Sequence, residues 1–207
     1  MDKTKLRTIA QRLVQKGKGI LAADESIPTI GKRFDNINLE NNLQNREKYR
    51  RLLFTTPNLS NYISGVITFD ETLRNQELTN NLVKDDILLG IKVDKGVKEL
   101  YNSHGETVTQ GLDDLDGRCQ EYVSLGATFA KWRGVLKIGH NLPSKLSLNQ
   151  NTETLARYAA ICQYNGLVPI IEPEIIMDGN HDYNTTYTVS KQVISHVYSK
   201  MEEHHVY

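Results

Sequence analysis

The sequence predicts an α/β protein built on a parallel β-sheet. Along most of its 207 residues, short apolar runs rich in β-forming residues alternate with helical patterns, as they do in βα units. Four of these runs also end in charge: ILAADES (20–26), LLGIKVDKG (88–96), FAKWRG (129–134) and VPIIEPEI (168–175). Because parallel strands present their carboxyl ends at one edge, these observations indicate a polar site at the mouth of a parallel sheet or barrel.

The first element expected is an N-terminal helix. An apolar stripe from Leu6 to Val14 recurs at helical spacing, and Asp2 can act as the N-cap. The same basic, amphipathic stretch could be a transit peptide. Its direct continuation through Lys16 and Gly17 into an apolar run favours a helix that docks on the sheet.

Five βα units should follow this helix. The predicted strands are 19–24, 63–69, 88–93, 128–133 and 168–172, and the predicted helices lie near 40–54, 113–125, 152–165 and 185–203. Asn151 can cap the third of these helices and Gly166 can close it, while Asp113 and Gly126 bracket the second. No linker or low-complexity tract divides the chain, so residues 1–207 are expected to form one domain. Five strands cannot close a barrel whose common form has eight, so an open doubly wound sheet and part of a barrel both fit.

Composition excludes several classes of partner. Acidic and basic residues number 25 each, so no net charge favours nucleic acid or an anionic membrane. The longest apolar stretch, VPIIEPEIIM, is too short to span a membrane and is interrupted by carboxylates. Cys119 and Cys162 lie in helical patterns without disulfide or metal spacing, which favours reduced thiols in a cytoplasmic protein. The histidines also lack metal-ligand spacing, and DGNHD (178–182) lacks the closing glutamate of a calcium loop, so no metal or other cofactor is expected.

Charged residues two positions apart share one face of a strand. The pairs are Lys92 with Asp94, Lys131 with Arg133, and Glu172 with Glu174. The two cations of the fourth strand repel each other, so they require anions, which the two glutamates or a ligand phosphate can supply. Trp132 lies between these cations in the sequence and should face away from them, under a helix.

The residues alone leave structural and functional readings open at two positions. Asp24 is either the N-cap of the next helix or an acid/base group at a strand end. Lys92 and Asp94 belong either to an ion network within the sheet or to a site in which the lysine binds a phosphate or tunes a carboxylate.

The glutamate pair is the sharpest local signal. Pro173 cannot donate to a central ladder, so regular pairing should end there and leave Glu172 and Glu174 at the rim of the sheet. A neighbouring Lys131 would lower the pKa of Glu172, whereas burial would raise it. The stronger influence decides between a salt bridge and general acid/base chemistry.

Together, five segments closely resemble the class I fructose-bisphosphate aldolases. They are GKGILAADES (17–26), GIKVDKGV (90–97), TQGLDDLDGRC (109–119), FAKWRGVLKIG (129–139) and LARYAAICQYNGLVPIIEPEI (155–175). The resemblance implies a (β/α)8 TIM barrel, of which this chain holds the N-terminal helix and the first five βα units. It also implies a metal-independent glycolytic lyase that cleaves fructose 1,6-bisphosphate into dihydroxyacetone phosphate and glyceraldehyde 3-phosphate through a lysine Schiff base.

The resemblance implies roles for matching residues. The catalytic set would be Asp24 at the reacting hydroxyl, Lys131 beside the carbinolamine, Glu172 as the proton carrier and Glu174 as its support. The substrate-binding set would be Ser26, Thr29, Lys92, Asp94 and Arg133, with its cations and hydroxyls at the phosphates.

Two departures from the family pattern carry expectations of their own. Ile27-Pro28-Thr29 stands where the family has a threonine-glycine-serine stretch, and Pro28 removes a backbone donor there. The Schiff-base lysine of the family would lie beyond Tyr207, so we expect the N-terminal part of an aldolase, inactive alone and a homo-oligomer, tetrameric by resemblance, when full length. The alternative is a non-catalytic remnant that binds sugar phosphates or a protein partner.

Overall fold

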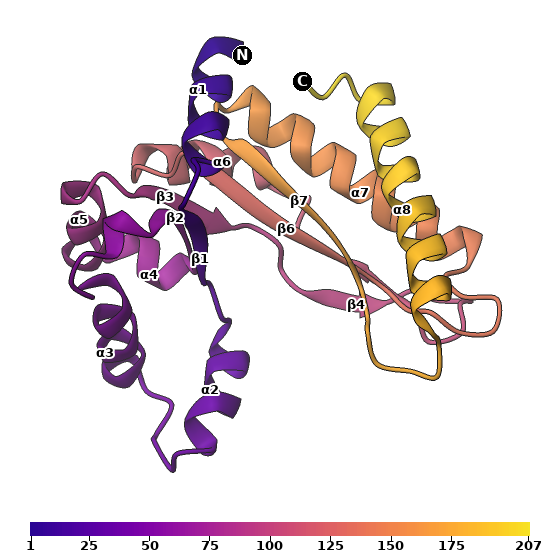
Figure 1. The fold of residues 1–207 in the computed structure, drawn as a ribbon, viewed down its shortest axis with the longest axis horizontal. Helices are drawn as coiled ribbons and strands as arrows, with labels where there is room; N and C mark the ends of the chain where they lie inside the picture. Colours follow the sequence, from indigo (N-terminus) through magenta and orange to yellow (C-terminus); the bar gives the residue numbers. More distant parts are fainter.

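The structure is a computed structural model that describes all residues, 1–207. Its centre is a five-stranded sheet in the order β1-β2-β3-β6-β7, in which every neighbouring pair is parallel (Figure 1). The strands are β1 (Gly19–Ala23), β2 (Ile63–Thr68), β3 (Leu88–Lys92), β6 (Phe129–Leu136) and β7 (Val168–Ile175). The α/β class with a parallel sheet is therefore confirmed, with every predicted strand present.

Helices connect and cover these strands. They are α1 (Lys3–Leu13), α2 (Ile27–Asp35), α3 (Leu43–Phe54), α4 (Asp70–Arg74), α5 (Gln76–Lys84), α6 (Leu115–Ser124), α7 (Lys145–Tyr164) and α8 (Tyr183–Glu203), with a 3-10 turn η1 (Leu59–Asn61). A short antiparallel hairpin, β4 (Val97–Glu99) and β5 (Thr107–Thr109), follows β3 outside the main sheet. None of the helices combines the length and apolarity needed to cross a bilayer.

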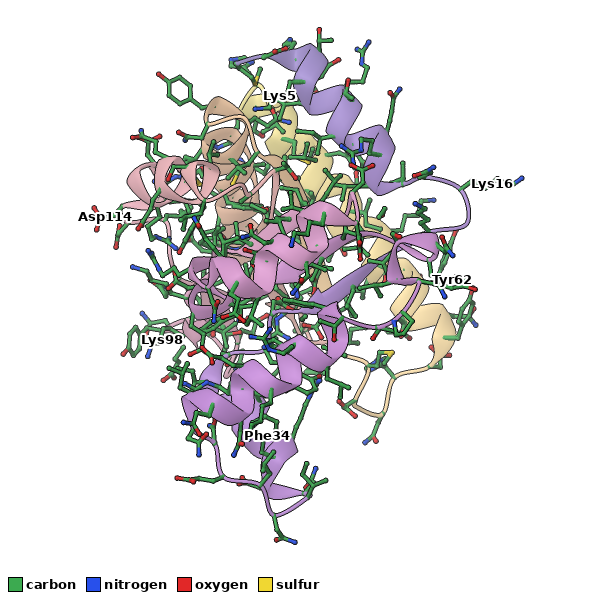
Figure 2. The ribbon with its side chains drawn as sticks, turned by 90° about the vertical axis from the view of Figure 1, so that its left-hand side faces the viewer. Lys5, Lys16, Phe34, Tyr62, Lys98 and Asp114 are labelled. Atoms are coloured by element: carbon green, nitrogen blue, oxygen red, sulfur yellow. The ribbon has the colours of Figure 1, made fainter.

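Two apolar cores hold the layers together. The larger core, of 25 buried residues, packs α4 to α8 against the sheet. The smaller one holds Ile9 and Leu13 of α1 against Ile67, Leu88 and Phe129 of the sheet. The N-terminal helix is thus docked as predicted, with Asp2 accepting a hydrogen bond from the Lys5 N–H as its N-cap. Figure 2 shows polar side chains at the two borders of the molecule, Lys16 and Tyr62 on one side and Lys98 and Asp114 on the other.

The start of α7 differs from the prediction. Ser144, not Asn151, caps the helix, and its hydroxyl accepts a hydrogen bond from the Ser147 N–H. Asn151 is buried in the second turn, where its amide donates to the carbonyls of Thr107 and Ser147. A residue that can cap a helix can also tie it to a neighbouring hairpin, and here the tie to β5 is formed. The last helix also begins earlier than predicted, with Asp182 as its N-cap.

The prediction that pairing ends at Pro173 was wrong. The β6–β7 ladder continues past it, with Gly134 opposite Pro173 and Leu136 opposite Ile175. The N–H of Val168 donates to the carbonyl of Thr128, just before β6, and the N–H of Ile176 donates to Leu136 at the end of β6. The even-numbered amides of β7 therefore face β6, and the odd-numbered positions face the other edge of β7. Pro173 therefore lacks its N–H on the side where no strand pairs in this structure, as a proline in an edge strand does.

Candidate functional site

The carboxyl ends of β1, β3 and β6 surround a cavity of about 920 Å³. Most of the predicted site residues line it: Asp24, Ser26, Thr29, Lys92, Asp94, Lys131 and Arg133. Glu172 and Glu174 are not among the lining residues, but they form ion pairs with the two cations of β6 that line the cavity. The predicted polar site at the mouth of the sheet is therefore formed.

Lys131 is the centre of the site. Its ammonium nitrogen lies 3.0 Å from Oδ2 of Asp24 and 3.5 Å from Oε2 of Glu172. Two strands separate β1 from β6 in the sheet, so a flat sheet would place them about 14 Å apart. Because side chains stand roughly perpendicular to a sheet, this contact requires the sheet to curl. The ion pair thus reports the curvature expected of a partial barrel.

Burial and neighbouring charges shift the pKa values of Lys131 and Glu172 in opposite directions. For Lys131, burial would lower the pKa, but the carboxylates of Asp24 and Glu172 outweigh it and the pKa is raised. For Glu172, burial is the largest influence and raises the pKa, despite the opposing charge of Lys131. Burial is therefore the stronger influence on the pKa of Glu172, although the ion pair with Lys131 is formed as well. Lys131 is held as an ammonium, while Glu172 can take up a proton more readily than an ordinary glutamate.

The other cation of β6 has its own partner. Nη1 of Arg133 lies 2.9 Å from Oε2 of Glu174, although its N–H is not directed at that oxygen. Trp132, between the two cations in the sequence, is fully buried and stacks on Tyr158 of α7, as predicted. The cations of β6 therefore face the cavity and meet the two glutamates of β7.

Lys92 differs from Lys131 because it has no carboxylate partner. Its ammonium lies 5.4 Å from the centre of the Phe69 ring, a cation–π contact. Asp94 accepts a hydrogen bond from the Gly96 N–H through one oxygen, and its other oxygen is buried without a partner. The ion network considered for these two residues is absent. Lys92 is instead a cation open to a ligand anion.

Asp24 does not cap the following helix. Ser26 occupies the N-cap position of α2, and its hydroxyl lies 2.9 Å from the hydroxyl of Thr29. Pro28 sits in the first turn of this helix, where a backbone N–H has no intrahelical acceptor and its loss costs little. Both hydroxyls line the cavity. The departure around Pro28 is therefore compatible with a polar wall at this position.

The groups around the cavity can bind anions and move protons. Lys92, Arg133 and the two hydroxyls can hold phosphate groups, because cations and hydroxyl donors pair with phosphate oxygens. Glu172 can exchange a proton with a carbonyl or hydroxyl, and the ammonium of Lys131 can stabilise negative charge beside it.

Residues 5–207 match the family model described as class-I fructose-bisphosphate aldolase. The chain belongs to that family. Fructose-bisphosphate aldolase 2 of Caenorhabditis elegans is 53% identical over 211 residues, which cover 100% of this chain and 58% of the relative. Cytosolic fructose-bisphosphate aldolase 5 of Arabidopsis thaliana is 53% identical over 203 residues, or 95% of this chain and 56% of the relative.

A solved aldolase structure extends the likeness to three dimensions. The Plasmodium falciparum fructose-bisphosphate aldolase, in complex with TRAP and a small-molecule inhibitor, matches with a TM-score of 0.96 and 50% identity over 98% of this chain and 60% of that one. The expected aldolase barrel fold is thereby confirmed for the part present. The chain spans somewhat more than half of the length of the relatives it matches.

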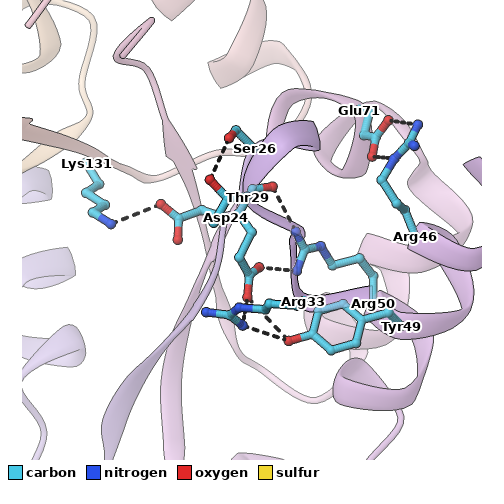
Figure 3. Close-up of polar contacts among 10 residues, drawn as sticks. Asp24, Ser26, Thr29, Arg33, Arg46, Tyr49, Arg50, Glu71 and Lys131 are labelled. Atoms are coloured by element: carbon cyan, nitrogen blue, oxygen red, sulfur yellow. Dashed lines mark hydrogen bonds and ion pairs between the residues drawn. The ribbon is translucent and has the colours of Figure 1, made fainter. Parts of the chain in front are cut away.

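The aldolase-family site rests on a buried cluster that sequence reasoning missed. Glu25 pairs with Arg50 and Arg33, and it accepts a hydrogen bond from the hydroxyl of Tyr49. Figure 3 shows Arg33, Tyr49 and Arg50 gathered on one side of Asp24. Burial would raise the pKa of Glu25, but the charges of the two arginines, chiefly Arg50, lower it. Since Asp24 directly precedes Glu25, this cluster fixes the chain where Asp24 reaches Lys131. Strand alternation could have placed Glu25 opposite Asp24, but nothing in the sequence marks Arg50 as buried.

A second missed group forms the outer wall of the aldolase-family cavity. The hydroxyl of Tyr122 donates to Asp70, and Arg74 bridges Asp70 and Glu121. Burial and the bond to Asp70 raise the pKa of Tyr122. Arg118, beside them, donates to the carbonyls of Val93 and Gly111 and so holds the segment that carries Asp94.

Proposed function

We propose that the protein containing these residues is a class I aldolase that cleaves fructose 1,6-bisphosphate into dihydroxyacetone phosphate and glyceraldehyde 3-phosphate through a lysine Schiff base. One observation carries the proposal. The ammonium of Lys131 lies between Asp24 and Glu172, while Lys92 stands in the same cavity without an anion. A site of this kind combines proton transfer with a place for phosphate.

We assign phosphate binding to the cations and hydroxyl groups of the cavity wall, which can donate hydrogen bonds to phosphate oxygens. Lys92 meets one phosphate directly, because no carboxylate competes for its charge. Arg133 turns from Glu174 to the ligand, an exchange that its half-exposed side chain allows. Ser26 and Thr29 add hydroxyl donors at the start of α2. Asp94 shapes this wall by holding the Gly96 N–H.

We assign proton transfer to the carboxylates around Lys131. Loss of water from a carbinolamine needs an acid at the departing hydroxyl, and Glu172 can supply that proton because burial raises its pKa. Lys131 stabilises the negative charge that develops on the substrate oxygen when the amine adds, and Glu174 supports Glu172 from the adjoining position. Asp24 then accepts the proton of a substrate hydroxyl, and loss of this proton lets the carbon–carbon bond break.

The lysine nucleophile is, in this proposal, not among residues 1–207. An amine must lose its proton to attack a carbonyl, and the raised pKa of Lys131 opposes that. We therefore infer that residues 1–207 alone bind the substrate without turning it over. In line with the cytosolic Arabidopsis relative, we place the reaction in the cytoplasm. We also propose that it belongs to glycolysis and that the enzyme is a homotetramer.

Calorimetry with fructose 1,6-bisphosphate tests the binding part. We expect the 207-residue chain to bind it and Lys92→Met to weaken the affinity by about tenfold or more, as loss of a charged phosphate contact does. Lys98→Met is the matched control, because Lys98 is an exposed lysine of β4 outside the cavity. Equal losses in both variants, or no binding at all, would contradict the site.

Turnover by a form extended through the sixth strand tests the catalytic part. We expect cleavage of fructose 1,6-bisphosphate that Glu172→Gln slows by about a hundredfold, the usual scale for a lost acid/base group. Binding without turnover in that extended form would instead favour a non-catalytic relative.

A further inference from the structure

Two thiols that the proposed function does not use lie next to each other in the core. Cys119 of α6 and Cys162 of α7 are both fully buried, and their sulfur atoms are 3.9 Å apart. They are the only cysteines of the chain and are 43 residues apart in the sequence. A disulfide has an S–S distance of about 2.05 Å, so α6 and α7 must draw slightly together as the two side chains rotate to bring the sulfurs into bonding range.

The thiol pair lies close to the cavity described above. Arg118 directly precedes Cys119 and lines that cavity, as does Tyr122 one turn further along α6. Helix α6 therefore contributes side chains both to the cavity wall and, through Cys119, to the buried core. The hydrogen bond with Cys162 and the positive charge of Arg118 also lower the pKa of Cys119, against the effect of its burial. The thiolate is the reactive form of cysteine, so Cys119 is the better nucleophile of the two.

We propose that Cys119 and Cys162 are a redox pair that hydrogen peroxide converts into an intramolecular disulfide, and that this bond loosens the segment 93–96 at the cavity wall. The proposal is independent of the aldol reaction. It rests on the distance between the sulfurs, on their seclusion from other thiols and on the hydrogen bonds of Arg118.

The chemistry balances with peroxide as the two-electron oxidant. The Cys119 thiol gives up its proton, the thiolate attacks one peroxide oxygen and the O–O bond breaks. The hydroxide that leaves takes up that proton as water, and a sulfenic acid remains on Cys119. The Cys162 sulfur then attacks the sulfenic sulfur, the S–S bond forms, the S–O bond breaks, and the displaced hydroxide takes the Cys162 proton as water. Two thiols and one peroxide thus give one disulfide and two waters.

Arg118 would transmit the effect of the Cys119–Cys162 disulfide to the cavity. Its Nη1 donates to the carbonyl of Val93 over 2.8 Å, and its Nη2 donates to the carbonyl of Gly111. Val93 lies between Lys92 and Asp94, and the next amide, Lys95, bonds to Gln110 over 2.8 Å. When the disulfide draws α6 toward α7, Arg118 moves with α6 and its grip on both carbonyls weakens. The oxidised chain should therefore show faster exchange at the 93–96 amides.

Mass spectrometry of the intact 207-residue chain tests disulfide formation. After mild peroxide treatment we expect both thiols to disappear and digestion to yield one peptide pair that joins Cys119 to Cys162. In the native chain the disulfide should exceed sulfinic acid by at least about tenfold, because the fold holds Cys162 beside the sulfenic acid of Cys119, whereas the urea-unfolded chain should give a larger share of sulfinic acid. Sulfinic acids or dimers between chains as the main native products, or the same product ratio in urea, would overturn the proposal, and none of these readouts depends on a variant.

Hydrogen exchange tests the coupling. We expect the Lys95 and Gly96 amides to exchange about fivefold faster in the oxidised chain, as a locally loosened segment does. A Cys119→Ser/Cys162→Ser variant treated with the same peroxide controls for methionine oxidation and should show no change. An oxidised wild-type chain with unchanged exchange at these amides would refute the link through Arg118.

Discussion

The ammonium of Lys131 and the carboxylate of Asp24 meet at 3.0 Å although 107 residues separate them in the chain. The contact joins the end of β1 to β6 across two intervening strands. Asp24 is also the nearer of the two carboxylates around Lys131, with Glu172 at 3.5 Å. This asymmetry gives the two carboxylates different roles in stability and in chemistry.

Asp24→Asn should destabilise the chain by about 2 kcal/mol, because it leaves the buried ammonium of Lys131 with only the more distant glutamate. Urea unfolding at neutral pH measures the loss. A variant as stable as the wild type would show that the ion pair does not hold β1 to β6.

Glu172→Gln should change the unfolding free energy by less than about 0.5 kcal/mol, because this carboxylate is partly exposed and screened by solvent. The raised pKa of Glu172 fixes the direction in which its contribution to stability changes with pH. A carboxyl group whose folded pKa lies above its ordinary 4.5 adds stability below that pH and loses it as the pH rises through the folded value. In urea titrations from pH 4 to 7, the wild type should thus lose stability relative to Glu172→Gln; the opposite trend would contradict the burial argument.

The pKa of Lys131 should fall in Asp24→Asn, since the carboxylate that offsets the effect of burial is removed. In the wild type the raised pKa adds stability that is fully present below pH 10.5 and is lost as the pH rises through the folded value. Nuclear magnetic resonance of the labelled lysine side chain gives the pKa directly. An unchanged value in the variant would show that Asp24 does not set it.

Arg50→Met should cost about 3 kcal/mol of unfolding free energy, because both Arg50 and Glu25 are buried and the glutamate would lose its main partner. Arg33→Met is the matched control and should cost less than about 1 kcal/mol, since Arg33 is 58% exposed. The lowered pKa of Glu25 makes this stability complete above about pH 4.5, with loss on acidification through the folded pKa. The gap between wild type and Arg50→Met should therefore narrow in acid, and equal costs for the two arginines would contradict the burial argument.

Much of the site could be read from the sequence because strand alternation is a strict rule. It placed Lys131 and Arg133 on one face and predicted that they need anions, and Glu172 and Glu174 supply them. It also sent Trp132 to the opposite face, under α7. Local periodicity was sufficient for these residues because each lies within a strand.

Contacts between distant segments could not be read in the same way. The choice between an N-cap and an ion pair for Asp24 depends on sheet curvature, which no local pattern encodes. The same holds for Arg50, which looks like one of several charged residues of α3 but is buried. The prediction that strand pairing ends at Pro173 was wrong because it treats β7 as a central strand. The missing N–H of Pro173 faces the unpaired edge of β7.

Several elements were missed for a simpler reason. Helix α2 begins directly after the ILAADES run, and α4 begins two residues after β2. Both helices are short, so neither has an apolar stripe long enough to be recognised. The hairpin of β4 and β5 consists of two short, largely polar strands, which alternation cannot distinguish from a loop.

We propose that Lys131 serves as a protonated partner of Asp24 and Glu172 and not as the amine that attacks the substrate. The decisive experiment is borohydride reduction of the 207-residue chain in the presence of dihydroxyacetone phosphate, followed by mass mapping of every lysine. We expect no reduced adduct on Lys131 or Lys92 at concentrations of this ligand that calorimetry shows to be saturating. A stoichiometric adduct on either lysine would show that it is the nucleophile.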